Sequence, residues 1–406
     1  MDLIFLGGFF PKQYTEEILE KSRLQIQNAA NIFQWAFIKG LEQNLKNNIR
    51  LVTAPYIGWY PKYYKDICLY TSRFTNGDDS ARSIMVGFVN LPLIKNYFKY
   101  VNLTSHINDL ICVSENTVIV VYSLDAAYLK AAIKAKRNNP NLKVCVIIPD
   151  LHEFPGDAGL LYKCYLKFYE KPTFYKLLSK IDSFVVLTDK MIEYLNIGHK
   201  PWLRIEGLYD VQSSGPPQGP NTKNDFKTIL YTGTLEYKYG IKELLNAFAL
   251  IKSDEYQLWI CGGGVGADLV KERAISDNRI KYFGIVTKQR VTELQKEATI
   301  LINPRNPVGE YNKFSFPSKT MEYFASGTPT LMYKIDGVPE EYFQYCYTIE
   351  GNTIEDISAA MFSTCELDKS ILQDKGKSAR AFILNNKSSE MQCKKVLDML
   401  RSMFNV

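Results

Sequence analysis

The stretch 314–330, which reads FSFPSKTMEYFASGTPT, constrains the fold more than any other part of the chain. Pro317, Ser318 and Lys319 are typical of a helix start, because proline suits the first helical position and serine caps free backbone amides. Gly327 is expected to end this helix. The sequence therefore predicts a short helix whose N-terminal amides and dipole favour an anion, with Lys319 adding a positive charge.

Glu322 follows one turn later, close to the helix face that carries Ser318 and Lys319. A carboxylate at this position is suited to hold a ribose diol beside a diphosphate bound at the helix start. The same spacing is also that of an ordinary capped helix with a solvated Lys–Glu pair. Spacing alone leaves both interpretations open.

The segment FPSKTMEYFASGTPTL resembles the nucleotide-binding segment of retaining, family 4-type glycosyltransferases, which have the GT-B fold and act in bacterial surface-polysaccharide synthesis. In that family the Pro-Ser-Lys turn cradles the donor diphosphate, and the glutamate before a small-residue-Gly-x-Pro ending holds the ribose. The resemblance implies that Pro317, Ser318 and Lys319 bind the diphosphate and that Glu322 binds the ribose. It also implies two Rossmann-like, doubly wound α/β domains that face each other across a cleft.

Length and composition narrow the class of protein. A chain of 406 residues exceeds the usual size of one core, so two domains are expected. The eight cysteines form no Cys-x-x-Cys pair and are typical of reduced core residues, while three histidines leave little room for a histidine-based metal centre. The sequence shows no signal peptide and no apolar run of membrane-spanning length, so we expect a cytoplasmic protein. The net charge of +6 suits anionic ligands or surfaces and does not indicate nucleic acid.

Residues 1–208 are predicted to form the first α/β domain, which opens with a buried strand followed by Gly7 and Gly8. These glycines either allow a tight turn or, as the resemblance implies, face the acceptor sugar. A strand-helix-strand unit over 117–150 implies a parallel sheet that binds ligands at the carboxyl ends of its strands. Acceptor specificity is expected in first-domain loops such as 54–64.

His152 follows one of these strand ends, between two acidic residues. It is either a satisfied turn residue or, by resemblance, a residue that reaches the reacting sugar from the first domain. The segment 162–180 alternates lysines with aromatic side chains. It is interpreted as a solvated basic face or as a surface that rests on anionic lipid headgroups.

Residues 209–226, rich in glycine, proline and polar residues, are predicted to be a linker. Residues 227–385 repeat the strand, glycine turn and helix pattern and form the predicted nucleotide-sugar domain. Residues 386–406 are predicted to hold an amphipathic helix, which in the resembling fold crosses back to the first domain.

The predicted donor site departs from the family pattern at its glycine turn. Many members have a Gly-Arg-Leu turn and a lysine before the next glycine, and both cations contact the diphosphate. Here Gly233 is followed by Thr234 at the arginine position, and Tyr239 stands at the lysine position. We hypothesise that Lys238 or Arg305 supplies the missing positive charge.

A second departure concerns the pair of glutamates that many members have with seven residues between them. Phe314 stands where the first glutamate is expected, eight residues before Glu322. In many relatives that glutamate approaches the donor sugar, so the identity of the sugar is less constrained than nucleotide binding. Glu310 could replace that glutamate only through a different loop path, and Asn312 and Lys313 are the other candidates to contact the sugar.

The segment Gly284-Ile285-Val286 follows another predicted strand. The resemblance implies that its backbone groups meet the nucleobase, whereas the pattern alone is equally that of a plain strand end.

The resemblance implies a hexosyl-type glycosyltransferase, EC 2.4, that moves a sugar from a UDP or GDP type donor to a glycan, with retention of configuration. The glycan is expected to be lipid-linked, in capsule, exopolysaccharide or lipopolysaccharide synthesis. Lys319, Arg305 and the helix start would neutralise the leaving diphosphate without a metal or cofactor, and His152 is the third catalytic candidate. The alternatives are a GT-B sugar-nucleotide 2-epimerase, which the few histidines disfavour, and a non-catalytic GT-B accessory subunit.

Overall fold

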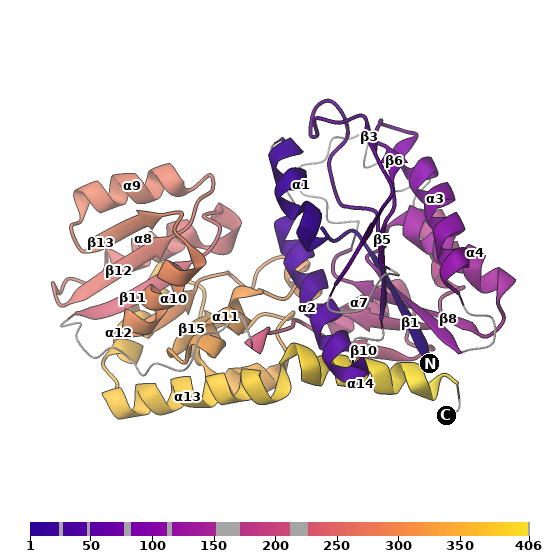
Figure 1. Cartoon of the computed structure of the whole chain (residues 1–406). Helices are drawn as coiled ribbons and strands as arrows, with labels where there is room; N and C mark the ends of the chain where they lie inside the picture. The colour runs from indigo at the N-terminus through magenta and orange to yellow at the C-terminus, as the bar shows by residue number, and fades with distance from the viewer. Residues whose placement is uncertain are drawn as a thin grey trace. The chain divides into compact units, whose positions relative to one another are not determined.

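The computed structural model describes residues 1–23, 27–46, 49–76, 83–111, 116–151, 171–211 and 226–404. The chain separates into two compact α/β units. Unit 1 consists of Met1–Leu208 and Ser389–Val406, and unit 2 consists of Tyr209–Ser388 (Figure 1).

Unit 1 is built on an eight-stranded sheet with the strand order β10-β9-β8-β7-β1-β2-β5-β4. The neighbours are parallel except β4 and β5, which are antiparallel. The strands are β1 (Asp2–Gly7), β2 (Arg50–Thr53), β4 (Ser72–Phe74), β5 (Ser83–Met85), β7 (Thr117–Tyr122), β8 (Leu142–Ile148), β9 (Ser183–Val186) and β10 (Trp202–Arg204). A separate antiparallel pair joins β3 (Cys68–Leu69) to β6 (Phe88–Val89).

The helices of unit 1 include the last helix of the chain. They are η1 (Lys12–Tyr14), α1 (Thr15–Lys21), α2 (Asn28–Leu45), α3 (Lys95–Leu110), α4 (Ala126–Asn138), α6 (Lys171–Leu178), α7 (Asp189–Leu195) and α14 (Ser389–Ser402). Helix α14 packs tightly on α2. Gly40 of α2 leaves no room for a side chain, since a Cβ atom there would lie 2.3 Å from the carbonyl oxygen of Ser389. Within the described ranges, no helix is both long and apolar enough to cross a membrane.

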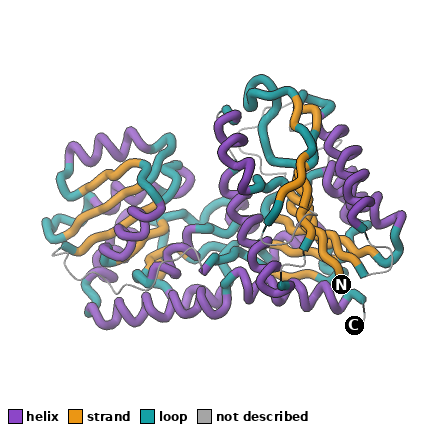
Figure 2. The backbone as a smooth tube through the Cα atoms, in the orientation of Figure 1, coloured by secondary structure: helices purple, strands orange, loops and turns teal. Residues whose placement is uncertain are grey.

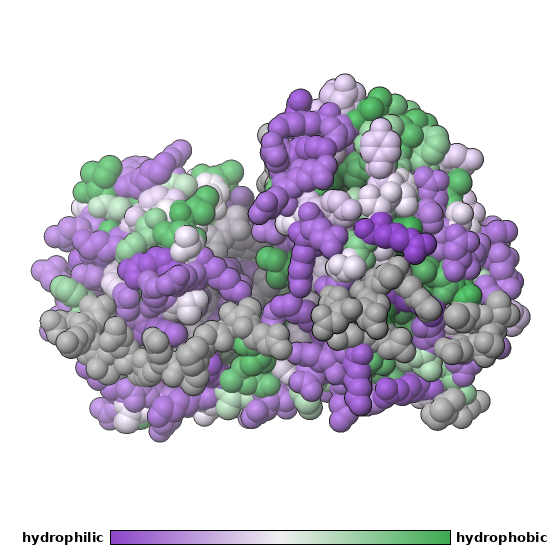
Figure 3. Space-filling view, viewed as in Figure 1, coloured by the Kyte–Doolittle hydropathy of each residue, from purple (hydrophilic) through white to green (hydrophobic). Residues whose placement is uncertain are grey.

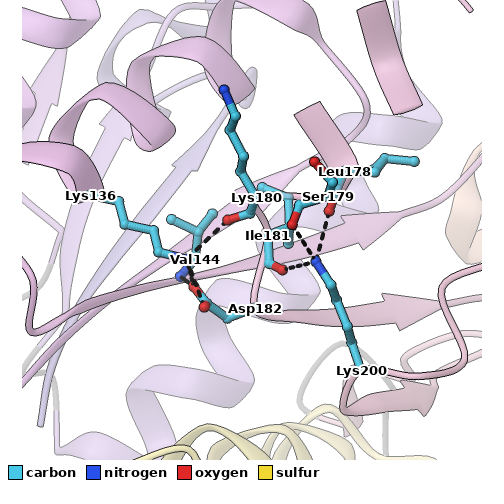
Figure 4. A network of polar contacts seen from close by, with 8 residues as sticks. All are labelled: Lys136, Val144, Leu178, Ser179, Lys180, Ile181, Asp182 and Lys200. Carbon is cyan, nitrogen blue, oxygen red and sulfur yellow. Dashed lines mark hydrogen bonds and ion pairs between the residues drawn. The ribbon is translucent and has the colours of Figure 1, made fainter. Parts of the chain in front are cut away.

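A polar network fixes the end of α6 to the sheet of unit 1 (Figure 4). The ammonium of Lys200 donates to three carbonyl oxygens at the helix end and just after it, so one side chain satisfies acceptors that a helix C-terminus leaves open. These carbonyls belong to Leu178 (3.1 Å), Ser179 (2.8 Å) and Ile181 (2.6 Å). Lys136 of α4 binds both carboxylate oxygens of Asp182 at 2.7 Å, and Asp182 accepts the amide of Val144 at 2.8 Å.

Unit 2 contains a six-stranded sheet, in which all pairs are parallel, with the order β13-β12-β11-β14-β15-β16. In chain order this is 3-2-1-4-5-6, the doubly wound arrangement that places a switch point between β11 and β14. The strands are β11 (Lys227–Thr232), β12 (Tyr256–Cys261), β13 (Ile280–Gly284), β14 (Ile300–Asn303), β15 (Thr330–Tyr333) and β16 (Tyr347–Ile349).

Helices flank the strands of unit 2 (Figure 2). The α-helices are α8 (Ile241–Phe248), α9 (Ala267–Ser276), α10 (Lys288–Glu297), α11 (Lys319–Ser326), α12 (Ile354–Cys365) and α13 (Lys369–Asn386), and the 3-10 helices are η4 (Tyr237–Tyr239), η5 (Glu310–Phe314) and η6 (Glu340–Tyr345). Alternate residues of β11 enter different cores: Ile229 and Tyr231 belong to the larger apolar cluster, and Leu230 belongs to the smaller one. Both faces of the sheet are therefore buried, as expected for a parallel sheet.

Candidate active site

Three loops at the carboxyl edge of the unit 2 sheet are held together by their backbones. The amide of Gly233, after β11, donates to Cys261 at 3.0 Å, and the amide of Gly262, after β12, donates to Gly284 at 2.8 Å. A Cβ atom on Gly262 would lie 1.8 Å from the carbonyl oxygen of Gly233. The absence of side chains here lets the loops approach one another directly.

Several predicted donor-binding residues lie on these loops. Thr234 and Lys238 are exposed on the loop after Gly233. Gly284 has a φ of +67°, with no atom within 4 Å of the position a Cβ would take. Ile285 is 85% exposed, although it is a large apolar residue. Val286, by contrast, packs partly against the smaller apolar cluster.

Helix α11 begins at Lys319, and Gly327 ends it with a left-handed φ of +80°, as predicted. The predicted cap by Ser318 is wrong: its side chain makes no capping hydrogen bond, because its φ of −51° and ψ of −28° are helical and not the extended values of a capping residue. Pro317 stands before this residue, and its carbonyl oxygen accepts the amide of Thr320 at 2.8 Å. The amides of Ser318 and Lys319 donate to none of the residues that the structure describes.

Lys319 and Glu322 form an ion pair on the surface of α11. The ammonium lies 2.7 Å from the carboxylate, and the two side chains are 39% and 47% exposed. The structure thus places both residues on one helix face, as predicted. Such an exposed pair contributes about 0–1 kcal/mol to stability, so either partner is readily released to a ligand.

Arg305 follows β14 and is buried, with 6% of its surface exposed. Its Nε donates to the side-chain oxygen of Asn312 at 2.8 Å. The guanidinium lies over the ring of Tyr311, 4.7 Å from its centroid. Among the described residues no carboxylate pairs with it, and it contacts the Asn312 amide oxygen and the tyrosine rings.

Tyr239, at the position of the family lysine, has two cations on its ring. The ammonium of Lys238 lies 5.3 Å from the ring centroid and the guanidinium of Arg305 lies 5.7 Å from it. A Cβ atom on Gly240 would lie 2.1 Å from the carbonyl oxygen of Pro304, so the η4 turn packs directly on the Arg305 loop. The structure therefore brings together Lys238 and Arg305, the two residues that we hypothesised to replace the missing positive charge.

Asn312 does not fit the role of a sugar contact. It is 1% exposed, its amide oxygen accepts from Arg305, and its amide nitrogen donates to Asn306 at 2.9 Å and to Val308 at 3.4 Å. The side chain thus closes the loop after β14 and orients Arg305. Glu310 is exposed on the same loop.

The two predicted acceptor-binding glycines are buried in unit 1. The amide of Gly8 donates to the side chain of Gln34 at 2.8 Å. A Cβ atom on Gly8 would lie 2.4 Å from the ring of Tyr56, and one on Gly7 would lie 2.2 Å from the Gln34 oxygen. Close packing accounts for both glycines, and an acceptor contact stays a prediction. His152 lies outside the described residues.

Sequence reasoning missed two lysines of α3 that reach the carboxyl end of β2. Lys99 is 2% exposed and lies 3.4 Å from the carbonyl oxygen of Ala54, and Lys95 donates to the carbonyl of Ile57. Burial lowers the pKa of Lys95 to about 7 and also lowers the pKa of Lys99. Three rings face the Lys99 ammonium: Phe88 at 4.9 Å, Tyr128 at 5.4 Å and Tyr56 at 5.7 Å. Lys95 and Lys99 are four residues apart and therefore share a helix face, but nothing in the sequence shows that this face is buried.

Nothing among the described histidines, cysteines and acidic residues forms a group of three that could hold a metal ion.

Residues 226–365 match the family model described as Glycosyl transferases group 1. No curated protein sequence matches the chain. Among solved structures, sucrose-phosphate synthase from Thermosynechococcus elongatus is 13% identical with a TM-score of 0.64, over 100% of both chains. The apo form of the lipopolysaccharide outer core galactosyltransferase WaaB is 13% identical with a TM-score of 0.60, over 99% of this chain and 100% of that one. The pneumococcal O-GlcNAc transferase GtfA, in complex with UDP and GlcNAc, is 11% identical with a TM-score of 0.61, over 100% of this chain and 99% of that one. The predicted GT-B fold is confirmed across the whole chain.

Proposed function

We propose that this chain, a GT-B glycosyltransferase with a group 1 domain at residues 226–365, moves a hexose from a nucleoside-diphosphate sugar to a glycan acceptor. One observation carries the proposal. At one edge of the unit 2 sheet, free backbone amides, an exposed cation and a carboxylate come together at the start of α11, inside the segment that matches the family.

The start of α11 is suited to a diphosphate. The amides of Ser318 and Lys319 have no acceptor in the described structure and lie at the positive end of the helix. On binding, the Lys319 ammonium exchanges Glu322 for a phosphate oxygen, and charge-assisted hydrogen bonds of this kind are stronger than neutral ones. Glu322 is then free to accept hydrogen bonds from the ribose hydroxyls.

Arg305 and Lys238 supply the positive charge that many family members carry at the positions of Thr234 and Tyr239. As the bond to the sugar breaks, negative charge grows on the leaving diphosphate, and fixed cations stabilise it most where water is excluded. Arg305 is buried, oriented by Asn312 and unpaired with any described carboxylate. In this proposal the chain needs no cofactor, and the donor is of the UDP or GDP type.

The exposed side chain of Ile285 offers an apolar surface for a flat nucleobase. The backbone groups of Gly284 and Val286 lie on either side of it in the chain and would contact the edge of the base. Uracil is the first base to test, because the similar GtfA structure contains UDP.

The acceptor side of the proposal rests on the resemblance and on one similar structure. WaaB is described as a lipopolysaccharide outer core galactosyltransferase. We place this chain in polysaccharide synthesis, with retention of configuration, a lipid-linked acceptor held at the Gly7-Gly8 end of unit 1, and His152 near the reacting sugar.

A transferase that uses a lipid-linked acceptor is expected to contact the inner face of the membrane. In unit 1, Leu93 is 100% exposed and Tyr97 is 64% exposed, next to the exposed Ile94 and Val101. Figure 3 shows green, hydrophobic surface at the upper right, over the region of β6 and α3. Exposed apolar clusters of this kind mark interaction surfaces, and aromatic rings suit the headgroup layer of a bilayer.

Flotation with vesicles that contain anionic phospholipid tests this contact. We expect the native protein to float with the vesicles and the double variant Leu93→Ser, Tyr97→Ser to remain behind. The control is Ile275→Ser, which removes an apolar side chain that is 88% exposed on α9 of unit 2. Equal flotation of all three proteins would refute the assignment of this surface.

The donor site is tested by thermal denaturation with UDP, GDP, ADP and CMP, each added to the native protein and to Glu322→Ala. A nucleotide at 100 times its dissociation constant adds about 2.7 kcal/mol, which is a clear rise in melting temperature. We expect one nucleotide to stabilise the native protein and Glu322→Ala to lose that response. The matched control is Glu193→Ala, which removes the carboxylate of an exposed Lys–Glu pair in α7. If no nucleotide stabilises the native protein, the accessory-subunit alternative replaces the transferase.

The role of Arg305 is tested by Arg305→Ala, which should weaken nucleotide binding by at least about tenfold, as expected for a hydrogen bond to a charged group. Asn312→Ala is measured beside it, because it removes the contact that orients Arg305 and keeps the cation. An Arg305→Ala protein that folds and binds as tightly as the native protein would exclude Arg305 from the site.

A further inference from the structure

Tyr323 joins α11 to the strand that carries the glycine turn. It is 1% exposed and follows Glu322 on the helix. Its hydroxyl accepts the backbone amide of Thr232 at 2.8 Å and donates to the carbonyl oxygen of the same residue at 3.0 Å. Burial raises the pKa of Tyr323, so the phenol keeps the proton that it donates.

These two backbone groups have lost their strand partner. On one side, Thr232 at the end of β11 is level with Cys261 of β12. On the other side, the ladder between β11 and β14 ends at Leu230 and Leu301. The Thr232 amide and carbonyl therefore lie where two neighbouring strands separate, at the switch point of the sheet, and buried groups of this kind need a partner. The phenol takes the place of the next rung of the ladder.

The contact has a consequence for the site, because each end of it adjoins a predicted ligand contact. Thr232 precedes Gly233 and Thr234, whereas Tyr323 follows Glu322 and lies one turn after Lys319. The hydroxyl thus fixes the spacing between the glycine turn and the start of α11. A ligand that spans both would bind more tightly to a site whose spacing is already set.

We propose that Tyr323 is a positioning residue that holds the glycine turn and α11 at the separation needed to grip one nucleoside diphosphate. The inference rests on the proposed donor site and deepens it, since it names a buried residue that touches no ligand. It assigns a ligand-binding role to a hydrogen bond that would otherwise count only toward stability.

The test compares Tyr323→Phe with Tyr333→Phe. Tyr333 is 2% exposed on β15 of the same unit, and its hydroxyl has no hydrogen-bond partner in the described structure. Each variant deletes one buried hydroxyl, but only the first breaks a contact. The measurements are calorimetric affinities for UDP and for uridine, together with hydrogen exchange of the Thr232 amide.

For Tyr323→Phe we expect UDP affinity to fall at least tenfold, uridine affinity to change by less than threefold, and the Thr232 amide to exchange faster. Uridine lacks the diphosphate, so it does not span both the glycine turn and the start of α11, and a change in their spacing should leave uridine affinity nearly unaffected. General destabilisation of the unit would instead weaken the binding of UDP and uridine alike. Tyr333→Phe should match the native protein in all three measurements.

Native-like UDP affinity in Tyr323→Phe, or equal losses for UDP and uridine, would overturn the positioning role while leaving the donor site intact. A native protein that binds none of the four nucleotides would overturn the proposed function, and the positioning role with it.

Discussion

The parallel sheet of unit 2 and the mostly parallel sheet of unit 1 differ at the carboxyl ends of their strands. In unit 2 three neighbouring strands, β11, β12 and β13, end in or just before a glycine, and their loops contact one another through backbone atoms. The polar groups of Thr234, Lys238 and Glu322 remain exposed. In unit 1 the corresponding turn at Gly8 is covered by the ring of Tyr56. The ammonium groups of Lys95 and Lys99 on α3 donate to the carbonyl oxygens of Ile57 and Ala54, which follow β2.

This difference shows that the topology places a possible ligand site at the carboxyl edge, and that the size of the side chains decides how much of the backbone there stays exposed. Both sheets present the carboxyl ends of parallel strands, where ligands bind in such folds. In unit 2 small residues leave donors unused at this edge. In unit 1 the ring of Tyr56 packs on the Gly8 turn and the α3 lysines donate to carbonyls after β2, so substitutions at these contacts are expected to act first through stability.

The largest effect on stability is expected from Gly262→Ala. Its φ of +139° disfavours any side chain, and the new Cβ would lie 1.8 Å from the Gly233 carbonyl oxygen, which belongs to backbone and cannot turn aside. Strain and overpacking together should lower the free energy of unfolding by about 3 kcal/mol or more, measured by urea denaturation. The control Gly284→Ala also has a positive φ but meets no atom within 4 Å. If both variants lose the same free energy, close approach is not the cause.

Gly8→Ala should cost less, because the atom it meets is a side chain. The added methyl group would lie 2.4 Å from the Tyr56 ring, which shifts at a cost of about 1–3 kcal/mol. Nucleotide affinity should equal that of the native protein, since the donor site is in unit 2. Reduced affinity would show that the two edges act together and would break the comparison.

Lys95→Met tests the filled edge through its pH dependence. The pKa of Lys95 is lowered by burial and by nearby Lys99, and Asp125 opposes this shift. Between pH of about 7 and 10.5 the unfolded chain holds the proton that the folded chain has released, so the free energy of unfolding rises with pH. The rise is at most about 1.4 kcal/mol per pH unit. Urea denaturation at several pH values should show this slope in the native protein and in Lys176→Met, and a flatter slope in Lys95→Met; equal slopes would contradict it.

Lys319→Met should have the smallest effect on stability and a large effect on binding. Its exposed ion pair with Glu322 contributes about 0–1 kcal/mol, so the melting temperature should hardly change. Nucleotide affinity should fall by about tenfold or more, because a charge-assisted hydrogen bond to phosphate is lost. A variant that loses stability but keeps its affinity would reverse the roles assigned to the two edges.

Local chemistry was enough to predict the helix at 319–326 and its end at Gly327, because the left-handed residue of a helix end is set by its own backbone. The α/β class followed from alternating strand and helix patterns. Three assignments could not be predicted: the uncapped Ser318 depends on its backbone angles, the buried Asn312 on how its own loop closes, and the buried Lys99 on contacts distant in sequence. Each side chain is polar, and only the folded chain shows whether its partner is solvent or protein.

The position of α14 in unit 1 has a consequence for how the protein is made. The chain leaves unit 1 at Leu208 and returns to it at Ser389, so unit 2 is one continuous segment and unit 1 is not. During synthesis, unit 2 is complete before the helix that packs on α2 has left the ribosome. A nascent chain therefore carries an uncovered α2 surface until α14 has emerged, and chaperones that bind apolar segments should remain on unit 1 longer than on unit 2.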